Sequence, residues 1–191
     1  MEIRTILENY RPRNAQEARD RQEMLRLLDT GLDLWGREGP AHFTASAWVV
    51  SPDRKHVLMA YHRIYRAWSW LGGHADGDRD LKKVALREVM EESGLKNVRL
   101  ADPEPLSLEI LTVDGHEKRG SYVSSHLHLN LTWLVEADME EKLTGNEEEN
   151  AGAAWYERDA AVAASSEEWF RERIYSKLNR RLEETEKGEE P

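Results

Sequence analysis

The chain has 191 residues, of which 34% are charged, and its 37 acidic against 27 basic side chains give a net charge of −10. This length fits one domain with room for extensions, and the acidic balance argues against nucleic-acid polymers or anionic membranes as partners, because both would repel it. The chain has no cysteine, which excludes disulfides, thiolate metal sites and cysteine nucleophiles and suits a reducing cytoplasm, where we expect the protein to be.

Residues 1–40 predict a helical lead-in without the apolar run of a signal peptide. Apolar side chains recur there at helical spacing, and Gly36 and Gly39-Pro40 are expected to end the helix. This stripe consists of Ala15, Ala18, Met24, Leu25, Leu28, Leu32 and Trp35. Further on, the longest uncharged apolar stretch, FTASAWVV, is too short to span a bilayer.

From His42 the pattern becomes that of strands. HFTASAWVVS and KHVLMAY flank the turn sequence SPDR, which predicts a hairpin. A loop through HRIYRAWSW leads to the glycine-rich LGGHADGD and then to a helix, DLKKVALREVMEES, which Gly94 is placed to end. LSLEILTV and SYVSSHLHLNLTWLV then predict two strands, the second with strict alternation of apolar and polar residues from His126.

The C-terminal part predicts a polar loop, GNEEENAG, a short strand, AAWYER, and a last helix introduced by Ser165 and Glu168 at capping-box spacing. The order of elements predicts an α/β or α+β sandwich with extra terminal helices. We divide it into a lead-in at 1–40, a central domain at 41–164, and a C-terminal helix and tail at 165–191. The terminal helices could pair two copies into a homodimer or pack on their own domain.

The helix over residues 80–93 carries glutamates on its apolar side. At about 100° per residue, Glu88, Glu91 and Glu92 continue the stripe that begins at Leu81. A solvated acidic face would more often have lysine four residues after Glu88, and an exposed like-charge pair costs about 0.2–0.5 kcal/mol. The helix dipole also disfavours carboxylates in the last turns. A divalent cation bound by oxygen ligands would offset both costs, whereas the alternative is an ordinary acidic surface.

The glycine pair before this helix, Gly72-Gly73, permits close backbone approach and could turn carbonyl or amide groups towards a metal ion or a phosphate. An ordinary tight turn is the alternative interpretation. The pair followed by carboxylates at spacing i, i+3 and i+4 is a more specific signal than either feature alone.

The stretch from Gly73 to Leu95, GHADGDRDLKKVALREVMEESGL, resembles the Nudix box, in which glycine, glutamate, Arg-Glu, Glu-Glu and glycine recur at set distances over 23 residues. The positions in register are Gly73, Arg87, Glu88, Val89, Glu91, Glu92, Gly94 and Leu95. The similarity extends over about residues 41–159. One position departs from the motif, because Arg79 stands where the first glutamate would be, between Asp78 and Asp80.

The resemblance implies a Nudix-like α/β/α sandwich with a mixed sheet, and Mg²⁺- or Mn²⁺-dependent hydrolysis of a diphosphate linkage in a nucleoside diphosphate derivative or similar small substrate. It implies that Glu88, Glu91 and Glu92 are metal ligands, joined by the Gly72 carbonyl, and that Arg87 orients Glu88. Family members often place a further acidic ligand or general base shortly before a tryptophan. The matching residue is Glu149, with Glu147 and Glu148 as close rivals.

Four further side chains are candidates for substrate binding. Arg63 and Arg66, just before the glycine pair, could meet phosphate, and His126 and His128 could line the same cleft. Exposed, solvated side chains are the alternative for all four. The role of His74, next to the glycine pair, is left open.

Arg79 favours a second hypothesis, a catalytically weakened Nudix-like module that binds a nucleotide and regulates a partner. In the family, the glutamate at this position supports the metal site and pairs with the box arginine, so Asp78 or Asp80 would have to substitute for it. A diphosphate isomerase of the same fold generally relies on a cysteine, which this chain lacks. The substrate stays undetermined, since residues 111–113 match neither the proline nor the tyrosine that marks some subfamilies.

Overall fold

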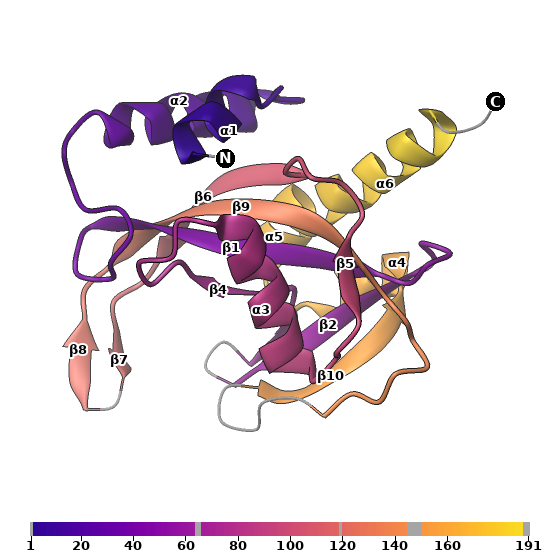
Figure 1. Ribbon diagram of the computed structural model, residues 1–191. Helices are drawn as coiled ribbons and strands as arrows, with labels where there is room; N and C mark the ends of the chain where they lie inside the picture. The colour runs from indigo at the N-terminus through magenta and orange to yellow at the C-terminus, as the bar shows by residue number, and fades with distance from the viewer. Residues whose placement is uncertain (1, 64–65, 119, 145–149, 189–191) are drawn as a thin grey trace.

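A computed structural model describes residues 2–63, 66–118, 120–144 and 150–188 (Figure 1). The lead-in forms two helices, α1 (Ile3–Asn9) and α2 (Ala15–Leu28). The helix α2 begins where the side chain of Asn14 accepts a hydrogen bond from the Glu17 amide, at 2.9 Å. It ends at Leu28 because the chain turns there, with Gly31 in the left-handed conformation at φ 75°. The prediction that Leu32 and Trp35 continue the helical stripe is therefore wrong, although Trp35 is buried.

The central sheet is mixed and has the strand order β10-β2-β1-β9-β5. These strands are β10 (Asn150–Glu157), β2 (His56–His62), β1 (Ala41–Val50), β9 (His126–Ala137) and β5 (Val98–Leu100). β1 and β2 form the predicted antiparallel hairpin, and β1 runs parallel to β9.

Three more strands join this sheet, and a small hairpin stands apart from it. β3 (Ala67–Ser69) pairs with β2, β4 (Leu71–His74) with β1, and β6 (Ser107–Val113) with β9. β7 (His116–Lys118) and β8 (Ser121–Val123) form the separate hairpin. The stretch SYVSSHLHLNLTWLV is therefore two strands, β8 and β9, and not the single one predicted.

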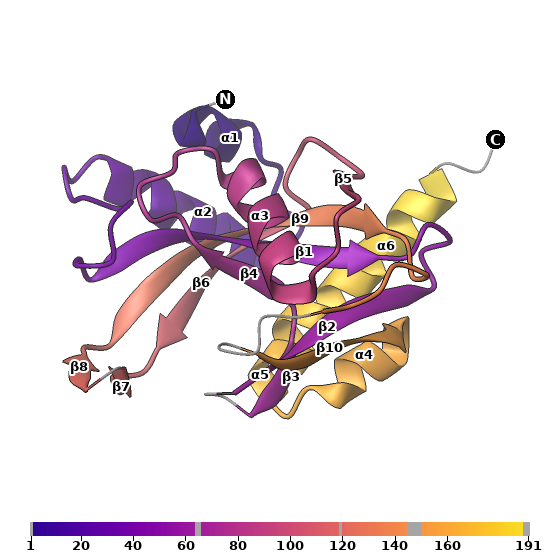
Figure 2. The ribbon, with the colours of Figure 1, turned by 60° about the horizontal axis from the view of Figure 1, so that its bottom comes forward.

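Helices cover both faces of the sheet, with α3 (Leu81–Ser93) in front and α6 (Ser176–Gly188) behind in the view of Figure 1. The helices α4 (Arg158–Ala164) and α5 (Glu168–Phe170) and a π-helical turn (Arg171–Tyr175) precede α6, and Figure 2 shows them below the sheet. Ser165 thus precedes a helix that begins only at Glu168, after Glu167 as its N-cap residue.

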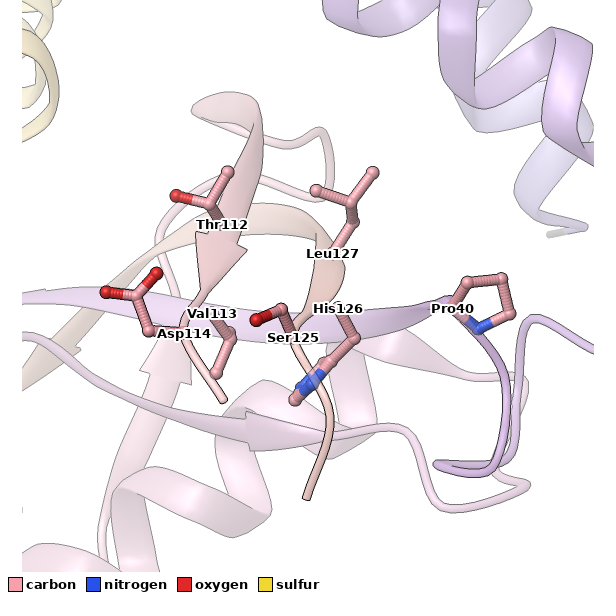
Figure 3. A pocket seen from close by; sticks show the side chains of 7 residues that line it. All are labelled: Pro40, Thr112, Val113, Asp114, Ser125, His126 and Leu127. Atoms are coloured by element: carbon pink, nitrogen blue, oxygen red, sulfur yellow. The ribbon is translucent and has the colours of Figure 1, made fainter. Parts of the chain in front are cut away.

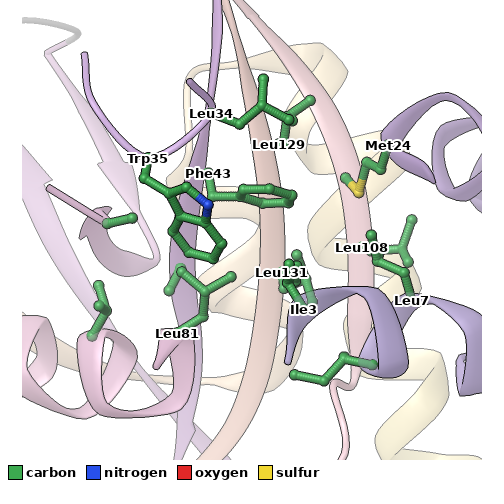
Figure 4. Packing of buried hydrophobic residues seen from close by; sticks show 14 of the residues in the cluster. Ile3, Leu7, Met24, Leu34, Trp35, Phe43, Leu81, Leu108, Leu129 and Leu131 are labelled. Carbon is green, nitrogen blue, oxygen red and sulfur yellow. The ribbon is translucent and has the colours of Figure 1, made fainter. Parts of the chain in front are cut away.

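The alternation of β1 and β9 divides the core between the two faces. Phe43, Leu129 and Leu131 face α1, α2 and α3 in one fully buried cluster (Figure 4). Trp48 on the opposite face packs with Tyr175 of the π-helical turn, and their ring centroids lie 5.3 Å apart. Burying each such large side chain contributes about 1.5–3 kcal/mol.

A buried ionic network joins the terminal helices to the edge strand β6. Lys177 Nζ of α6 lies 2.6 Å from Glu109 Oε1 of β6 and 3.2 Å from Glu17 Oε1 of α2. Arg181 of α6 also donates to Glu17. Two cations thus balance two carboxylates inside the protein, and the terminal helices pack on their own sheet.

The residue boundaries of the three-part division stay a prediction.

In the parts of the chain that the structure describes, no helix combines the length and the apolar composition that crossing a membrane requires.

Candidate active site at the glycine pair and helix α3

The glycine pair lies in strand β4, so it is not a tight turn. Gly72 is opposite Ser46, and Gly73 is opposite Ala45 on β1. A Cβ atom on Gly72 would lie 2.6 Å from the Ala45 carbonyl oxygen, and one on Gly73 would lie 2.4 Å from Glu88 Cδ. Backbone atoms of β1 leave no room for a side chain at Gly72, whereas the space beside Gly73 is filled by the Glu88 carboxylate.

Two glutamates of α3 reach the glycine pair. Glu92 is buried, and its Oε2 accepts a hydrogen bond from the Gly72 amide at 3.0 Å. The side chain of Glu88 is 14% exposed and lies against Gly73. Glu91 differs, because its side chain is 59% exposed. The predicted inward position therefore holds for Glu88 and Glu92, while Glu91 lies at the solvent edge of the stripe.

Arg87 lies beside two of these carboxylates. Its Nη2 donates to Glu88 Oε1 at 2.8 Å, and its Nε lies 4.0 Å from Glu91 Oε1. The hydrogen bond to Glu88 raises the pKa of Arg87 and outweighs the opposite effect of partial burial. The structure thus joins Arg87 and Glu88 by a hydrogen bond.

Arg79 faces the N-terminal segment, since its Cζ lies 5.1 Å from the centroid of a Trp35 ring. Asp80 caps α3 by accepting from the Lys83 amide at 3.3 Å. Asp78 lies close enough to Arg87 to contribute to its raised pKa, after the contributions of Glu88 and Glu91. Glu88 and Glu91 are thus the main negative neighbours of the box arginine and Asp78 is a weaker one, while Arg79 lies over an aromatic ring.

The residues at the glycine pair fit a hard divalent cation. Carboxylates and backbone carbonyls are the ligands that Mg²⁺ prefers, and Glu88 and Glu92 flank a backbone segment that carries no side chains. The space that a Cβ of Gly73 would occupy is the space in which the Glu88 carboxylate lies. The side chains of Glu88 and Glu92 and the carbonyl of Gly72 could hold such an ion.

The other predicted site residues are placed elsewhere. Arg63 and Arg66 are exposed at the connection between β2 and β3, and Arg66 has a positive φ of 51°. His128 lies opposite His42 in the β1–β9 register, and His126 lies two residues before it. Because side chains alternate along a strand, these histidines are on the face of the sheet away from Glu88. Glu147, Glu148 and Glu149 lie outside the described residues.

Sequence reasoning missed a cluster of histidines on that other face. In the described part of the chain, one group of three metal-binding side chains has its ligand atoms within 4.8 Å of one another, namely His42, His74 and His128. The alternation of β9 was readable, but the pairing of β1 with both β4 and β9, which brings the three together, was not.

Comparison with known proteins identifies the family. The NUDIX domain family model matches residues 40–178, which is more than half of the chain. The chain belongs to the Nudix family. Its members are typically pyrophosphohydrolases that depend on divalent metal ions, so the resemblance of the box is confirmed.

Solved Nudix-like structures share the fold at low sequence identity. A C. elegans Ap4A hydrolase binary complex is 18% identical with a TM-score of 0.56, covering 76% of this chain and 98% of that one. An E. coli dihydroneopterin triphosphate pyrophosphohydrolase is 17% identical with a TM-score of 0.53, covering 76% and 99%. The MutT protein from Methanosarcina mazei Go1 is 15% identical with a TM-score of 0.54, covering 78% and 97%.

No curated protein sequence matches the chain. The solved structures confirm the predicted α/β fold with a mixed sheet, and the low identities limit the likeness to the fold.

Proposed function

We propose that this Nudix protein is a divalent-metal-dependent hydrolase that cleaves a diphosphate linkage in a nucleoside diphosphate derivative or a similar small phosphorylated substrate. One observation carries the proposal: Glu92 accepts from the Gly72 amide while Glu88 fills the space beside Gly73. This packing brings two box glutamates of α3 to a bare stretch of backbone in β4. A purely structural helix has no need for carboxylates in that position.

Each side chain has a role that follows from its contacts. Glu88 and Glu92 would hold the cation, because the Arg87 guanidinium orients the first and the Gly72 amide orients the second. Exposed Glu91 would complete the set from the solvent side, where substrate enters. A bound Mg²⁺ or Mn²⁺ neutralises diphosphate oxygens and makes water more acidic.

The remaining tasks, proton removal and substrate binding, fall to the other candidate residues. A carboxylate must take the proton of the attacking water, and Glu149 stays our candidate, with Glu147 and Glu148 as rivals. Arg63 and Arg66 are exposed cations that could bind phosphate in the substrate. We keep His126 and His128 as candidates for contacts with more distant parts of the substrate only.

The alternative, a catalytically weakened module that binds a nucleotide and regulates a partner, rests on Arg79. Its guanidinium stacks on Trp35, and Asp78 contributes negative charge near Arg87. This arrangement favours the enzyme over the weakened module, because Arg79 contacts Trp35 and its charge is not directed at Arg87.

Glu92→Gln tests the enzymatic proposal, because glutamine keeps the size of the side chain and an oxygen that can accept from Gly72. We expect kcat/KM to fall by more than about 100-fold, since losing even a group that only supports a metal ligand costs ~10–100-fold. The substrates are a panel of nucleoside diphosphate sugars, dinucleoside polyphosphates, nucleoside triphosphates and dihydroneopterin triphosphate, with Mg²⁺ or Mn²⁺. The readout is chromatographic separation of the two phosphorylated products that cleavage of a diphosphate linkage releases.

Glu23→Gln is the matched control, since Glu23 pairs with Arg26 on the surface of α2, and it should retain full activity. The proposal fails if the wild-type protein turns over none of the panel in a metal-dependent way, or if Glu92→Gln is as active as the control.

A further inference from the structure

Four of the seven histidines converge at one end of β1 and β9. The ring centroid of His42 lies 5.1 Å from that of His74, 5.0 Å from that of His126 and 4.9 Å from that of His128. His128 also lies 4.9 Å from His74 and 5.1 Å from His126. The register explains this arrangement, since His42 is opposite His128 and His74 is opposite Thr44, two residues further along β1.

His42 is the observation that points to a ligand. Its side chain is 1% exposed, and neither Nδ1 nor Nε2 has a hydrogen-bond partner among the described residues. A buried polar nitrogen without a partner is unfavourable, because it has lost its contacts with water. Coordination of a metal ion would satisfy one of these nitrogens, and the ring centroids of three other imidazoles lie within 5.1 Å of that of His42.

The geometry of the cluster is close to that of a metal site. The ligand atoms of His42, His74 and His128 lie within 4.8 Å of one another. In tetrahedral zinc sites the Zn–N distance is about 2.0–2.1 Å, which places two nitrogen ligands ~3.3 Å apart. Binding would therefore bring the nitrogens closer to one another by up to about 1.5 Å.

His126 offers a fourth ligand. Its Nδ1 lies 2.8 Å from the carbonyl oxygen of Ser124, which can only accept a hydrogen bond. Nδ1 therefore carries the proton, and Nε2 keeps its lone pair. Nε2 lies 3.2 Å from Nε2 of His128, so the lone pair faces the cluster. A backbone carbonyl that orients an imidazole in this way is typical of metal-binding histidines.

Burial disfavours a positive charge on two of the rings, and a metal-bound imidazole is neutral. Burial lowers the pKa of His42 to about 4, with the charges of His126 and Arg37 acting in the same direction and that of Asp76 against them. Burial and the neighbouring histidines lower the pKa of His128 to about 2.

We propose that His42, His74, His126 and His128 form a second metal site, which binds Zn²⁺ or a similar divalent transition-metal ion. Imidazole nitrogen suits zinc, nickel, copper and cobalt, whereas carboxylate and carbonyl oxygen suit magnesium and manganese. The two sites use opposite faces of β4, because the missing side chain of Gly73 faces Glu88 and the next residue, His74, faces the histidines. An ion there would tie β4 to β1 and β9 beside the glycine pair.

A pocket lies next to this site. It has a volume of about 290 Å³, and its lining includes Pro40, Asp114, Ser125 and His126. Figure 3 shows the His126 ring among the side chains that line it. His126 is the one member of the cluster in this lining.

The test is direct metal binding by the full chain without an affinity tag, so it does not depend on any enzymatic activity. The protein is first freed of metal with a chelator and then titrated with Zn²⁺ by calorimetry and with Co²⁺ by visible absorption. His74→Gln and His128→Gln remove ligands that are only partly buried. His116→Gln removes a histidine outside the cluster, whose Nδ1 contacts the Asp114 carbonyl, and Glu92→Gln alters the other site.

We expect the wild-type chain, His116→Gln and Glu92→Gln to bind about one Zn²⁺ and to give the strong visible absorption of four-coordinate Co²⁺. His74→Gln and His128→Gln should weaken Zn²⁺ binding by at least ~10–100-fold, since this is the cost of losing a group that only supports a ligand. Far-UV circular dichroism confirms that each variant is folded, and His74→Gln alone decides if His128→Gln does not fold. Wild type that binds no Zn²⁺, folded His74→Gln that binds it as tightly as wild type, or binding that disappears in Glu92→Gln would overturn the proposal.

Discussion

Adding one methyl group at Gly73 should displace the Glu88 carboxylate. The three atoms nearest to a Cβ at this position would be Glu88 Cδ at 2.4 Å, Oε2 at 2.5 Å and Oε1 at 2.9 Å, against ordinary contacts of 3.4–4 Å. The carboxylate must therefore move by about 1 Å. The backbone of Gly73 is outside the left-handed region, so Gly73→Ala perturbs the side-chain packing and adds no strain in φ.

Two magnitudes follow for Gly73→Ala. Overpacking of this kind costs about 1–3 kcal/mol of unfolding free energy. A shift of about 1 Å in a group that positions the reaction lowers the rate by ~100-fold, so kcat should fall by that factor under the proposed function. Urea denaturation measures the first effect, and metal-dependent turnover on the best substrate of the panel measures the second.

Glu88→Ala supplies the matched background for this experiment. Without the carboxylate, Gly73→Ala should be neutral or stabilise the protein by up to about 1 kcal/mol, because alanine loses less backbone entropy on folding than glycine. A thermodynamic cycle of the four proteins isolates the clash. An equal loss of stability from Gly73→Ala in both backgrounds would refute the packing of Glu88 against Gly73, whatever the activity shows.

Three further predictions concern the network and the departure in the box. Lys177→Met removes one of the two cations that balance the buried carboxylates of Glu17 and Glu109. It should lower the free energy of unfolding by about 3–5 kcal/mol and Tm by roughly 6–20 °C. A decrease in Tm no larger than that of the exposed control Lys142→Met would contradict this prediction. Burial raises the pKa of Glu17, but the Arg13 amide and the charges of Arg181 and Lys177 outweigh it and lower the pKa overall. Glu17 therefore contributes stability above its unfolded pKa of about 4.3, and this stability is lost as the pH falls through the lower folded pKa. Urea denaturation at descending pH should show a smaller loss of unfolding free energy in Glu17→Gln than in the wild type. Parallel pH profiles of the two proteins would contradict a role of the Glu17 charge in the network. Arg79→Glu should change kcat by less than about tenfold, because Arg79 stacks on Trp35; a larger gain would favour the weakened module.

The sequence alone was sufficient for the box helix and its surroundings. Glu88 and Glu92 are four residues apart, so a helix must place them on one side, and Gly94 ends that helix in the left-handed conformation that glycine adopts at low cost. The hairpin of β1 and β2 and the alternation of β9 were likewise readable, because turn residues and two-residue periodicity are local properties. Local spacing also placed Glu91 on the buried stripe, but its side chain is 59% exposed, which the spacing within one helix does not reveal.

The features that depend on pairing between distant segments were decided only by the tertiary structure. Arg79 looked like a defect in the box, and its partner Trp35 is separated from it by a strand hairpin and a loop. His42 and His128 are distant in sequence, and they meet because β1 pairs in parallel with β9. Periodicity tells which side chains share a face of one strand, but not which strand lies next to it. The glutamate site could therefore be predicted from a single helix, whereas the histidine cluster required the register of three strands.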